Sequence, residues 1–488
     1  MASSDGTSRE PVTTQKWTTI GFTGHRQLDD EKLVRSALAD CLDNFIEKYG
    51  SIVSYSSVAS GADTLFLETA EAQSVPAMIV LPFGQSRFKA DFKEEDWLRA
   101  EKQIHRAIEF DVVETIASDK EAYLDAGVIT VDRCDILLAV WNLEENYGTG
   151  GTSDAIKYAR SLNKPIIIIN AITGKTHIEN ADQLPAECVK CDTPHSKGEL
   201  EVIKNNYHYY DTLASKKGPQ ARSLSIVIIL LHLIASGFAI TGIIFKDGLN
   251  DFNPNILLAI GIVKLLALVL AWTLVFWHHR IQHHWTSTRP KAELYRFFIA
   301  IWPLKRRKVN ITLANVTEFS DLAKNIMISW EMDRDSELSF SNAKQHYLEN
   351  RIRDQINYYR SKIKASTFTN YITKKFSNAL MVIAIVGALC AVGFKLAHMG
   401  DYFADSAILI SVFLPLLVAA LLAISVAHDT NRRAQRYQNM LMHLETADRE
   451  VDTSVTWPSL WRAVEKLEYE LLNEVEEWHS MTRFSNSH

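Results

Sequence analysis

The sequence predicts an α/β domain with a doubly wound, Rossmann-like parallel sheet, followed by an all-α membrane domain with four transmembrane helices in two hairpins. Three observations predict this fold class. Short apolar segments alternate with helix-prone segments over residues 17–170. Four long runs in the second half of the chain carry almost no charge. Glycine-rich turns follow several of the apolar segments, as they do in nucleotide-binding sheets.

The apolar segments of the first part have the length and composition of buried strands. They are short, rich in β-branched residues and continuously apolar, which is typical of strands covered on both faces. Helix-prone stretches lie between them, for example at 29–49 and 64–73. This alternation predicts a parallel sheet that binds ligands beyond the carboxyl ends of its strands. The predicted strands are Trp17–Phe22, Ile52–Ala59, Ala77–Pro82, Asp111–Ile116, Asp135–Trp141 and Pro165–Asn170.

The charge-poor runs of the second half are long enough to cross a bilayer. Residues 223–245, 376–394 and 406–428 carry no charge, and residues 252–279 carry only Lys264. A spanning helix needs about 20 apolar residues, and a stretch of 18 or more is the usual threshold. A large buried helical core is the alternative, but four paired runs are hard to bury in a protein of this size.

The connections and flanking charges predict the topology of these helices. Short polar connections join the runs pairwise, so each pair forms an antiparallel hairpin. Basic residues flank the other ends, as at Lys216, Lys217 and Arg280, whereas the connections carry aspartates. By the positive-inside rule, both termini and the α/β domain face the cytoplasm. We therefore expect a multi-pass protein of the inner cell membrane.

These observations define the expected domains. Residues 1–16 are polar and are expected to form a disordered leader; residues 17–195 form the α/β domain. The first hairpin module covers 196–300, with spans at about 224–245 and 256–277. A cytoplasmic helical segment covers 301–365. The second hairpin module covers 366–488, with spans at about 377–397 and 407–427.

Composition argues against several classes of function. The formal charge of −6 and the isoelectric point near 6.3 do not indicate the basic surface that nucleic-acid-binding proteins carry, so nucleic acid is not the expected partner. Five cysteines are few and odd in number, which indicates a reducing compartment. We expect no metal and no cofactor: Cys188 and Cys191 form a lone pair, and the histidines of 278–284 are placed to meet lipid headgroups.

Three loops that follow predicted strands could bind a phosphate-bearing ligand. Gly24 frees the first turn, and Arg26 offers a fork of donors to phosphate. Gly61 lets the backbone approach a ligand, while Asp63 could accept from a ribose hydroxyl or simply cap a helix. Glycines and hydroxyls in the third loop precede a helix, where Asp154 could bind a sugar or complement the helix dipole. The candidate residues are Thr23, Gly24, His25, Arg26, Ser60, Gly61, Asp63, Gly148, Gly150, Gly151, Thr152, Ser153 and Asp154.

Two further residues extend this candidate site. The segment 81–96 could form a lid that brings Arg87 near the ligand, although a surface loop is an equal alternative. Trp141 ends its strand at the same edge and could stack on a base or pack in the core. The glycine spacing fits neither a P-loop nor the G-x-G-x-x-G fingerprint, and it is the three loops together that indicate a nucleotide-type pocket.

Taken together, "GFTGHR", "SGAD", "VDRCDILLAVW" and "GTGGTSDAIKYAR" resemble the SLOG superfamily over residues 17–170. That superfamily includes the LOG phosphoribohydrolases, DNA-processing protein A and ligand-sensing domains of antiphage systems. Residues 196–480 resemble SLATT modules, which are two-helix membrane effectors associated with SLOG domains. The resemblance implies a domain that senses a cytoplasmic nucleotide-type messenger, such as a cyclic nucleotide or an NAD-derived signal.

The sequence departs from the LOG enzymes at the catalytic motif. Their PGGxGTxxE motif has its acid three residues after the threonine, whereas Asp154 follows Thr152 by two, and no proline precedes the glycines. A displaced carboxylate would face elsewhere on its helix, so a sensor is favoured over an enzyme. A membrane-anchored LOG-like phosphoribohydrolase is the alternative. A structural membrane protein with a vestigial pocket is the third hypothesis.

Polar and irregular positions within the spans suggest a path across the membrane. Lys264 lies near the middle of its span and His232 at a similar depth of the preceding one, so the two could line a polar seam, or Lys264 could extend toward the headgroups. Pro415 would kink the fourth span and could belong to a gate. Four helices enclose little space, so we expect a homo-oligomeric pore.

Overall fold

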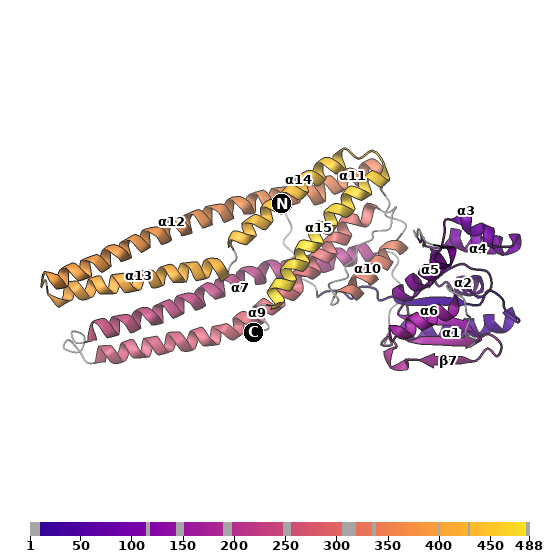
Figure 1. Ribbon diagram of the computed structural model, residues 1–488, viewed down its shortest axis with the longest axis horizontal. Coiled ribbons are helices and arrows are strands. Elements are labelled where there is room, and N and C mark those ends of the chain that lie inside the picture. The colour runs from indigo at the N-terminus through magenta and orange to yellow at the C-terminus, as the bar shows by residue number, and fades with distance from the viewer. Residues whose placement is uncertain are drawn as a thin grey trace. The chain divides into compact units, whose positions relative to one another are not determined.

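The computed structural model describes residues 10–113, 118–142, 151–188, 198–246, 255–304, 319–333, 338–398, 400–427 and 430–484. The chain forms two compact units. The first comprises residues 1–12, 200–320 and 336–488, and the second comprises residues 13–199 and 321–335. The predicted fold class is confirmed, because the second unit is an α/β sheet domain and the first is helical (Figure 1).

The α/β unit is built on a seven-stranded sheet with the order β4-β3-β2-β1-β5-β6-β7. All neighbouring strands are parallel except β6 and β7. From β1 the chain adds β2, β3 and β4 on one side of the sheet, and it then adds β5, β6 and β7 on the other side of β1. The topological switch point therefore lies between β1 and β5. The strands are β1 (Thr18–Gly24), β2 (Ile52–Ser56), β3 (Ala77–Leu81), β4 (Glu109–Val112), β5 (Ile136–Trp141), β6 (Ile166–Asn170) and β7 (Thr176–Glu179).

Helices cover both faces of this sheet, which explains its continuously apolar strands. The buried side chains form a separate core on each face of the sheet. Ile20 and Phe22 of β1 belong to the core on the face covered by α1, α2 and α4. Leu137 and Ala139 of β5 join the core on the opposite face, with α6 and the end of α5. The helices are α1 (Glu31–Tyr49), α2 (Ala62–Ala72), α3 (Gln85–Phe88), η1 (Lys89–Asp91), α4 (Glu94–Arg106), α5 (Asp119–Arg133), α6 (Thr152–Ser161) and η2 (Ala181–Gln183).

A helix from much later in the chain completes the second face. In α10 (Ser320–Met332), Ile328 packs with Trp17, Val53 and Met78. The Nζ atom of Lys324 lies 2.8 Å from both carboxylate oxygens of Asp135, which is the residue before β5. Residues 321–335 thus belong to the α/β unit, although they lie within the stretch 301–365 that the sequence indicates only as a cytoplasmic helical segment.

The helical unit contains four helices that are long and apolar enough to cross a membrane. In each apolar window at most 17% of the residues are buried within the chain, so these windows do not form a globular core. The chain is therefore a multi-pass membrane protein. The helices are α7 (Glu199–Ile244), α9 (Asn255–Ile301), α12 (Asp354–Leu396) and α13 (Asp401–Ala427).

The second hairpin, α12–α13, is closely packed through small residues. The buried positions of α12 follow one another at intervals of three and four residues: Ser377, Leu380, Ala384, Gly387 and Ala391. A Cβ atom on Gly387 would lie 3.0 Å from Ile410 Cγ2 of α13. Small residues let helix backbones approach closely, which is the main means of helix association in lipid. Helix α13 also contacts the first hairpin, since Gly237 of α7 packs against its Phe413.

Outside the spans, the long helices continue into a helical bundle with a buried charged network. The remaining elements are η3 (Trp302–Leu304), α11 (Phe340–Tyr347), a π-helical turn η4 (Leu348–Arg353), α14 (Thr430–Asp452) and α15 (Trp457–Phe484). Arg351 in the π-helical turn binds both carboxylate oxygens of Glu468 in α15, at 2.8 and 2.6 Å. The hydroxyl of Tyr347 donates to the same carboxylate at 2.6 Å. All three side chains are buried, so this network fixes α15 against the entry to the second hairpin.

Candidate functional site

The loops after β1 and β5 meet at the topological switch point. Gly24 and Val140 are paired at the ends of these strands, and the amide of His25 donates to the carbonyl of Val140 at 3.3 Å. The Nε2 atom of His25 accepts from the backbone amide of Asn142 at 3.1 Å, and Asn142 Oδ1 lies 2.9 Å from the same nitrogen. His25 therefore ties the two loops together. Thr23, within β1, is half-buried beside Ala139.

The glycines of the first two loops serve loop packing. A Cβ atom on Gly24 would lie 2.4 Å from the Cβ atom of Ala62, at the start of α2. Gly61 has φ +88°, and a Cβ atom there would lie 2.3 Å from the carbonyl oxygen of Arg26. The carbonyl of His25 accepts from the amide of Ala62 at 2.9 Å. The two glycines thus let the loop after β1 lie directly on the N-terminus of α2, beside half-buried Ser60.

Replacing Gly61 by alanine should destabilise the protein by at least about 3 kcal/mol, because both the positive φ and the contact with the Arg26 carbonyl exclude a side chain. Thermal unfolding of the detergent-solubilised chain measures this. Gly127→Ala is the matched control: it lies within α5, where the added methyl group meets its nearest neighbour at 3.7 Å. We expect the control to be neutral or slightly stabilising, and equal loss in both variants would contradict the proposed packing.

Asp63 lies at this junction as a buried acid. It is 6% exposed and occupies the first turn of α2, whose N-cap position is taken by Gly61. Its Oδ1 atom is buried and has no hydrogen-bond partner among the described residues. Burial raises the pKa of Asp63 to about 8, although Arg26 and the backbone amides of Ala59 and Gly24 act in the opposite direction. The carboxyl group is thus held in its neutral form, in which it can both donate and accept a hydrogen bond.

The third loop leads into α6 on the other face of the sheet. Gly151 is the N-cap, and no side chain caps the helix. Thr152 and Ser153 are buried, and the hydroxyl of Ser153 has no hydrogen-bond partner among the described residues. Asp154 is half-buried. Gly148 and Gly150 lie outside the described residues, which exclude 143–150.

Unpaired buried polar atoms gather at this edge of the sheet. Besides Asp63 Oδ1 and Ser153 Oγ, the hydroxyl of Ser56 at the carboxyl end of β2 is buried and has no hydrogen-bond partner among the described residues. Buried polar atoms in native proteins nearly always have partners, so each such atom calls for an explanation. Two helix N-termini, which carry partial positive charge, begin at the same edge. This combination favours a ligand with hydroxyl and phosphate groups.

Arg26 and Arg87 lie in one network of aromatic and acidic side chains. The guanidinium of Arg26 stacks 4.7 Å from the ring centre of Tyr123, and that of Arg87 stacks 4.7 Å from the ring centre of Phe83. The two rings contact each other edge to face. Tyr123 donates to Asp91, which pairs with Arg87 at 2.9 Å. The segment that carries Arg87 is thus anchored near Arg26, as the lid hypothesis requires.

The two arginines differ in their ion pairing. Arg87 is paired with Asp91 and also with Asp119 at the start of α5. Arg26 is exposed and makes no ion pair among the described residues, so its guanidinium is the cation available to an anionic ligand. Burial and the hydrogen bond to Asp91 raise the pKa of Tyr123 to about 12, which keeps the phenol neutral beneath Arg26.

Trp141 has a different environment from the other candidates. It is 5% exposed and packs among Ala155, Ile156 and Ile168 on the α6 face of the sheet. This placement fits the packing alternative, because a buried ring offers no face to a base. Sequence reasoning missed Asn142 and Tyr123. The position of Asn142 directly after a strand could have indicated it, whereas nothing in the sequence connects Tyr123 with Arg26.

The candidate pore residues lie on three different helices, His232 on α7, Lys264 on α9 and Pro415 on α13. His232 is exposed within the chain, and its Nδ1 atom lies 2.8 Å from the carbonyl oxygen of Ile228. Lys264 is also exposed, and no ion pair or hydrogen bond of its side chain occurs among the described residues. Pro415 lies within α13, two residues after Phe413, which packs on α7. Both alternatives for Lys264, a polar seam in an oligomer and extension toward headgroups, remain predictions.

One comparison with known proteins bears on the helical unit. Residues 347–478 match the family model of SMODS and SLOG-associating 2TM effector domain 1, SLATT_1. The match begins at Tyr347 and ends at Trp478, so it contains the π-helical turn, the second hairpin and the buried Arg351–Glu468 pair. No curated protein matches the chain. The SLATT resemblance is confirmed for the second hairpin, while the SLOG resemblance of residues 17–170 stays a prediction.

The SLATT_1 match and the four apolar helices fit a membrane effector of defence systems. The α/β unit has the parallel topology of a Rossmann-like domain, with loops gathered at its switch point. The chain therefore combines a Rossmann-like sheet domain with a segment that matches a two-helix effector family.

Proposed function

We propose that the chain is a ligand-controlled membrane effector. A cytoplasmic nucleotide-type messenger binds at the carboxyl edge of the sheet, and its binding rearranges the membrane helices of a homo-oligomer so that a permeable path opens. The observation that carries this proposal is the fusion of the polar switch-point edge, with Arg26 and Asp63, to a segment that matches a two-helix effector family.

Arg26, the helix N-termini and neutral Asp63 offer complementary chemistry for such a messenger. The exposed guanidinium of Arg26 and the partial positive charge at the N-termini of α2 and α6 suit phosphate groups. The neutral carboxyl group of Asp63 suits a ribose hydroxyl or a base, since it costs no charge repulsion beside a phosphate. A cyclic nucleotide and an NAD-derived signal both carry these groups.

The chain also offers a route from the ligand edge to the effector helices. Strand β5 has Asn142 directly after its carboxyl end and Asp135 directly before its amino end. Asp135 holds α10 through Lys324, and along the chain α10 is followed by α11, the π-helical turn and α12. A ligand that favours one position of this rigid strand and helix can therefore bias the second hairpin, provided that it binds the two states with different affinity.

A dye-leakage assay with the full chain in liposomes tests the proposal. We expect release with one of the candidate cyclic nucleotides or NAD-derived compounds and none without ligand. Arg26→Ala should weaken binding about tenfold to a hundredfold, since it removes a charged hydrogen bond. Lys264→Leu should alter permeation without altering binding. The absence of leakage, together with the absence of ligand-dependent stabilisation for every candidate, would overturn the proposal.

A membrane-anchored phosphoribohydrolase is the second candidate, and the raised pKa of Asp63 favours it. A carboxyl group that is protonated near neutral pH can act as a general acid toward a departing base. This candidate requires turnover of nucleoside monophosphates by the purified chain. It also requires that Asp63→Asn or Asp154→Asn abolish turnover and that Lys264→Leu leave it unchanged. A sensor shows no turnover.

A further inference from the structure

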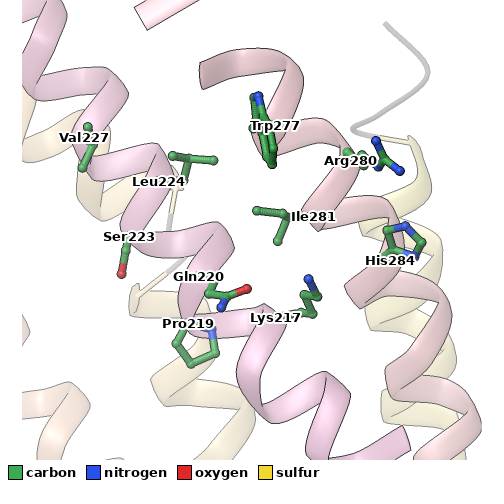
Figure 2. Close-up of a pocket in the computed structure, with 10 residues that line it drawn as sticks. All are labelled: Lys217, Pro219, Gln220, Ser223, Leu224, Val227, Trp277, Arg280, Ile281 and His284. Atoms are coloured by element: carbon green, nitrogen blue, oxygen red, sulfur yellow. The ribbon is translucent and has the colours of Figure 1, made fainter. Parts of the chain in front are cut away.

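A groove of about 770 Å³ lies between α7 and α9 of the first hairpin. Figure 2 shows Lys217 and Leu224 of α7 and Ile281 of α9 pointing into the space between the two helices. At one end of the groove, a Cβ atom on Gly218 would lie 3.0 Å from the indole of Trp285, so the helices are in contact there. The two helices also approach each other near the other end of the hairpin, where a Cβ atom on Gly242 would lie 3.5 Å from Ile260 Cγ2.

The lining of the groove changes from basic to apolar along the helices. Lys217 and His284 line the part next to the contact between Gly218 and Trp285, and Arg280 follows about one turn nearer the apolar run of α9. Leu224, Val227 and Trp277 extend the lining toward the apolar runs. Lys217 precedes the charge-free run 223–245, and Arg280 follows the run 252–279. The groove thus straddles the boundary at which both helices leave the membrane.

Lys217 and Arg280 carry unpaired charge in the described part of the chain. No ion pair of Lys217 or Arg280 occurs among the described residues, although two cations on facing helices repel each other. Trp277 is 65% exposed, and an indole at the end of a span is typical of the headgroup level. An amphiphile with an anionic head and an apolar tail would pair the cations and cover the apolar side chains.

We propose that this groove binds one anionic phospholipid. Its phosphate lies near Lys217 and Arg280, and an acyl chain runs from there along Leu224 and Val227 beside Trp277. Basic pockets between membrane helices bind anionic headgroups by this combination of charge and apolar contact. The bound lipid fills the space between α7 and α9 and so supports the loosely closed first hairpin.

Native mass spectrometry and thermal unfolding of the purified full chain test this proposal. We expect phosphatidylglycerol to be retained and to stabilise the protein more than phosphatidylcholine does. Lys217→Ala and Arg280→Gln should each lower the affinity about fivefold. Lys216→Ala is the matched control, because it removes the same charge from the neighbouring, exposed position of α7, outside the groove, and it should leave the affinity unchanged.

Three results would overturn the proposal: equal stabilisation by phosphatidylcholine, equal stabilisation by inorganic phosphate, or an equal loss in Lys216→Ala. If the groove variants do not fold, cross-linking of the unaltered protein gives an independent answer. Phosphatidylglycerol with a photoreactive acyl chain should label peptides that contain 217–227 and 277–284. Labelling spread evenly over all four spans would contradict a specific site.

Discussion

The variant Asp63→Asn should be more stable than the native chain at pH 8, and the gain should shrink as the pH falls toward 4. Folding raises the pKa of Asp63 from 3.8 to about 8, because burial disfavours the charged form. Between these values the folded chain holds a proton that the unfolded chain releases. Rising pH therefore favours unfolding, by up to ~1.4 kcal/mol per pH unit, and asparagine removes this dependence.

The measurement is thermal or chemical unfolding of both proteins at several pH values between 4 and 8. Asp29→Asn is the control, since it removes a carboxylate from an exposed position three residues after Arg26. We expect the control to change stability by less than about 0.5 kcal/mol at any of these values. Parallel pH profiles of the native chain and Asp63→Asn would show that Asp63 is not held neutral.

Arg351→Met should destabilise the helical unit by about 3–5 kcal/mol, because it leaves the carboxylate of Glu468 buried without its cation. Glu468 is 0% exposed, and its remaining partner, the hydroxyl of Tyr347, carries no charge. Burial, and after it the neighbouring Glu468 charge, raises the pKa of the Tyr347 phenol, so that phenol stays protonated.

Two further variants make this test specific. Arg353→Met is the matched control two residues away, because Arg353 pairs with Asp448 at 3.3 Å on the surface and should cost less than about 1 kcal/mol. The double variant Arg351→Met with Glu468→Leu removes both charges and should recover much of the stability. Thermal unfolding in detergent compares them. Equal losses in the single and double variants would contradict a charge-based network.

The local sequence was sufficient to predict most strands of the sheet and the four long apolar helices. Continuous apolar strands and uncharged runs depend on a residue's immediate neighbours along the chain, so both can be recognised without tertiary contacts. The strand expected at Asp111–Ile116 begins at Glu109 instead, and the antiparallel strand β7 was not predicted. Its exposed, polar pattern, with Thr176, Ile178 and Glu179 on an edge, gives a weak signal.

The same sequence indicated which loops form the candidate site but misjudged what their glycines do. Glycine is needed at positions 24 and 61 because the loop after β1 lies directly on the N-terminus of α2. This contact brings together residues that are more than 30 positions apart in the sequence. Asp63 was recognised as a candidate, yet its neutral state depends on burial by the whole α/β unit. The orientation of Trp141 toward the α6 face likewise follows from the sheet's packing.

That a parallel α/β sheet and four long apolar helices share one chain follows from residue patterns alone, because both patterns are local and periodic. The place of α10 follows only from packing, since its attachment joins Lys324 to Asp135 across 189 positions. Packing also brought Arg351 to Glu468 and opened a groove between α7 and α9. Contacts of this kind depend on how elements pack, and no short stretch of sequence records them.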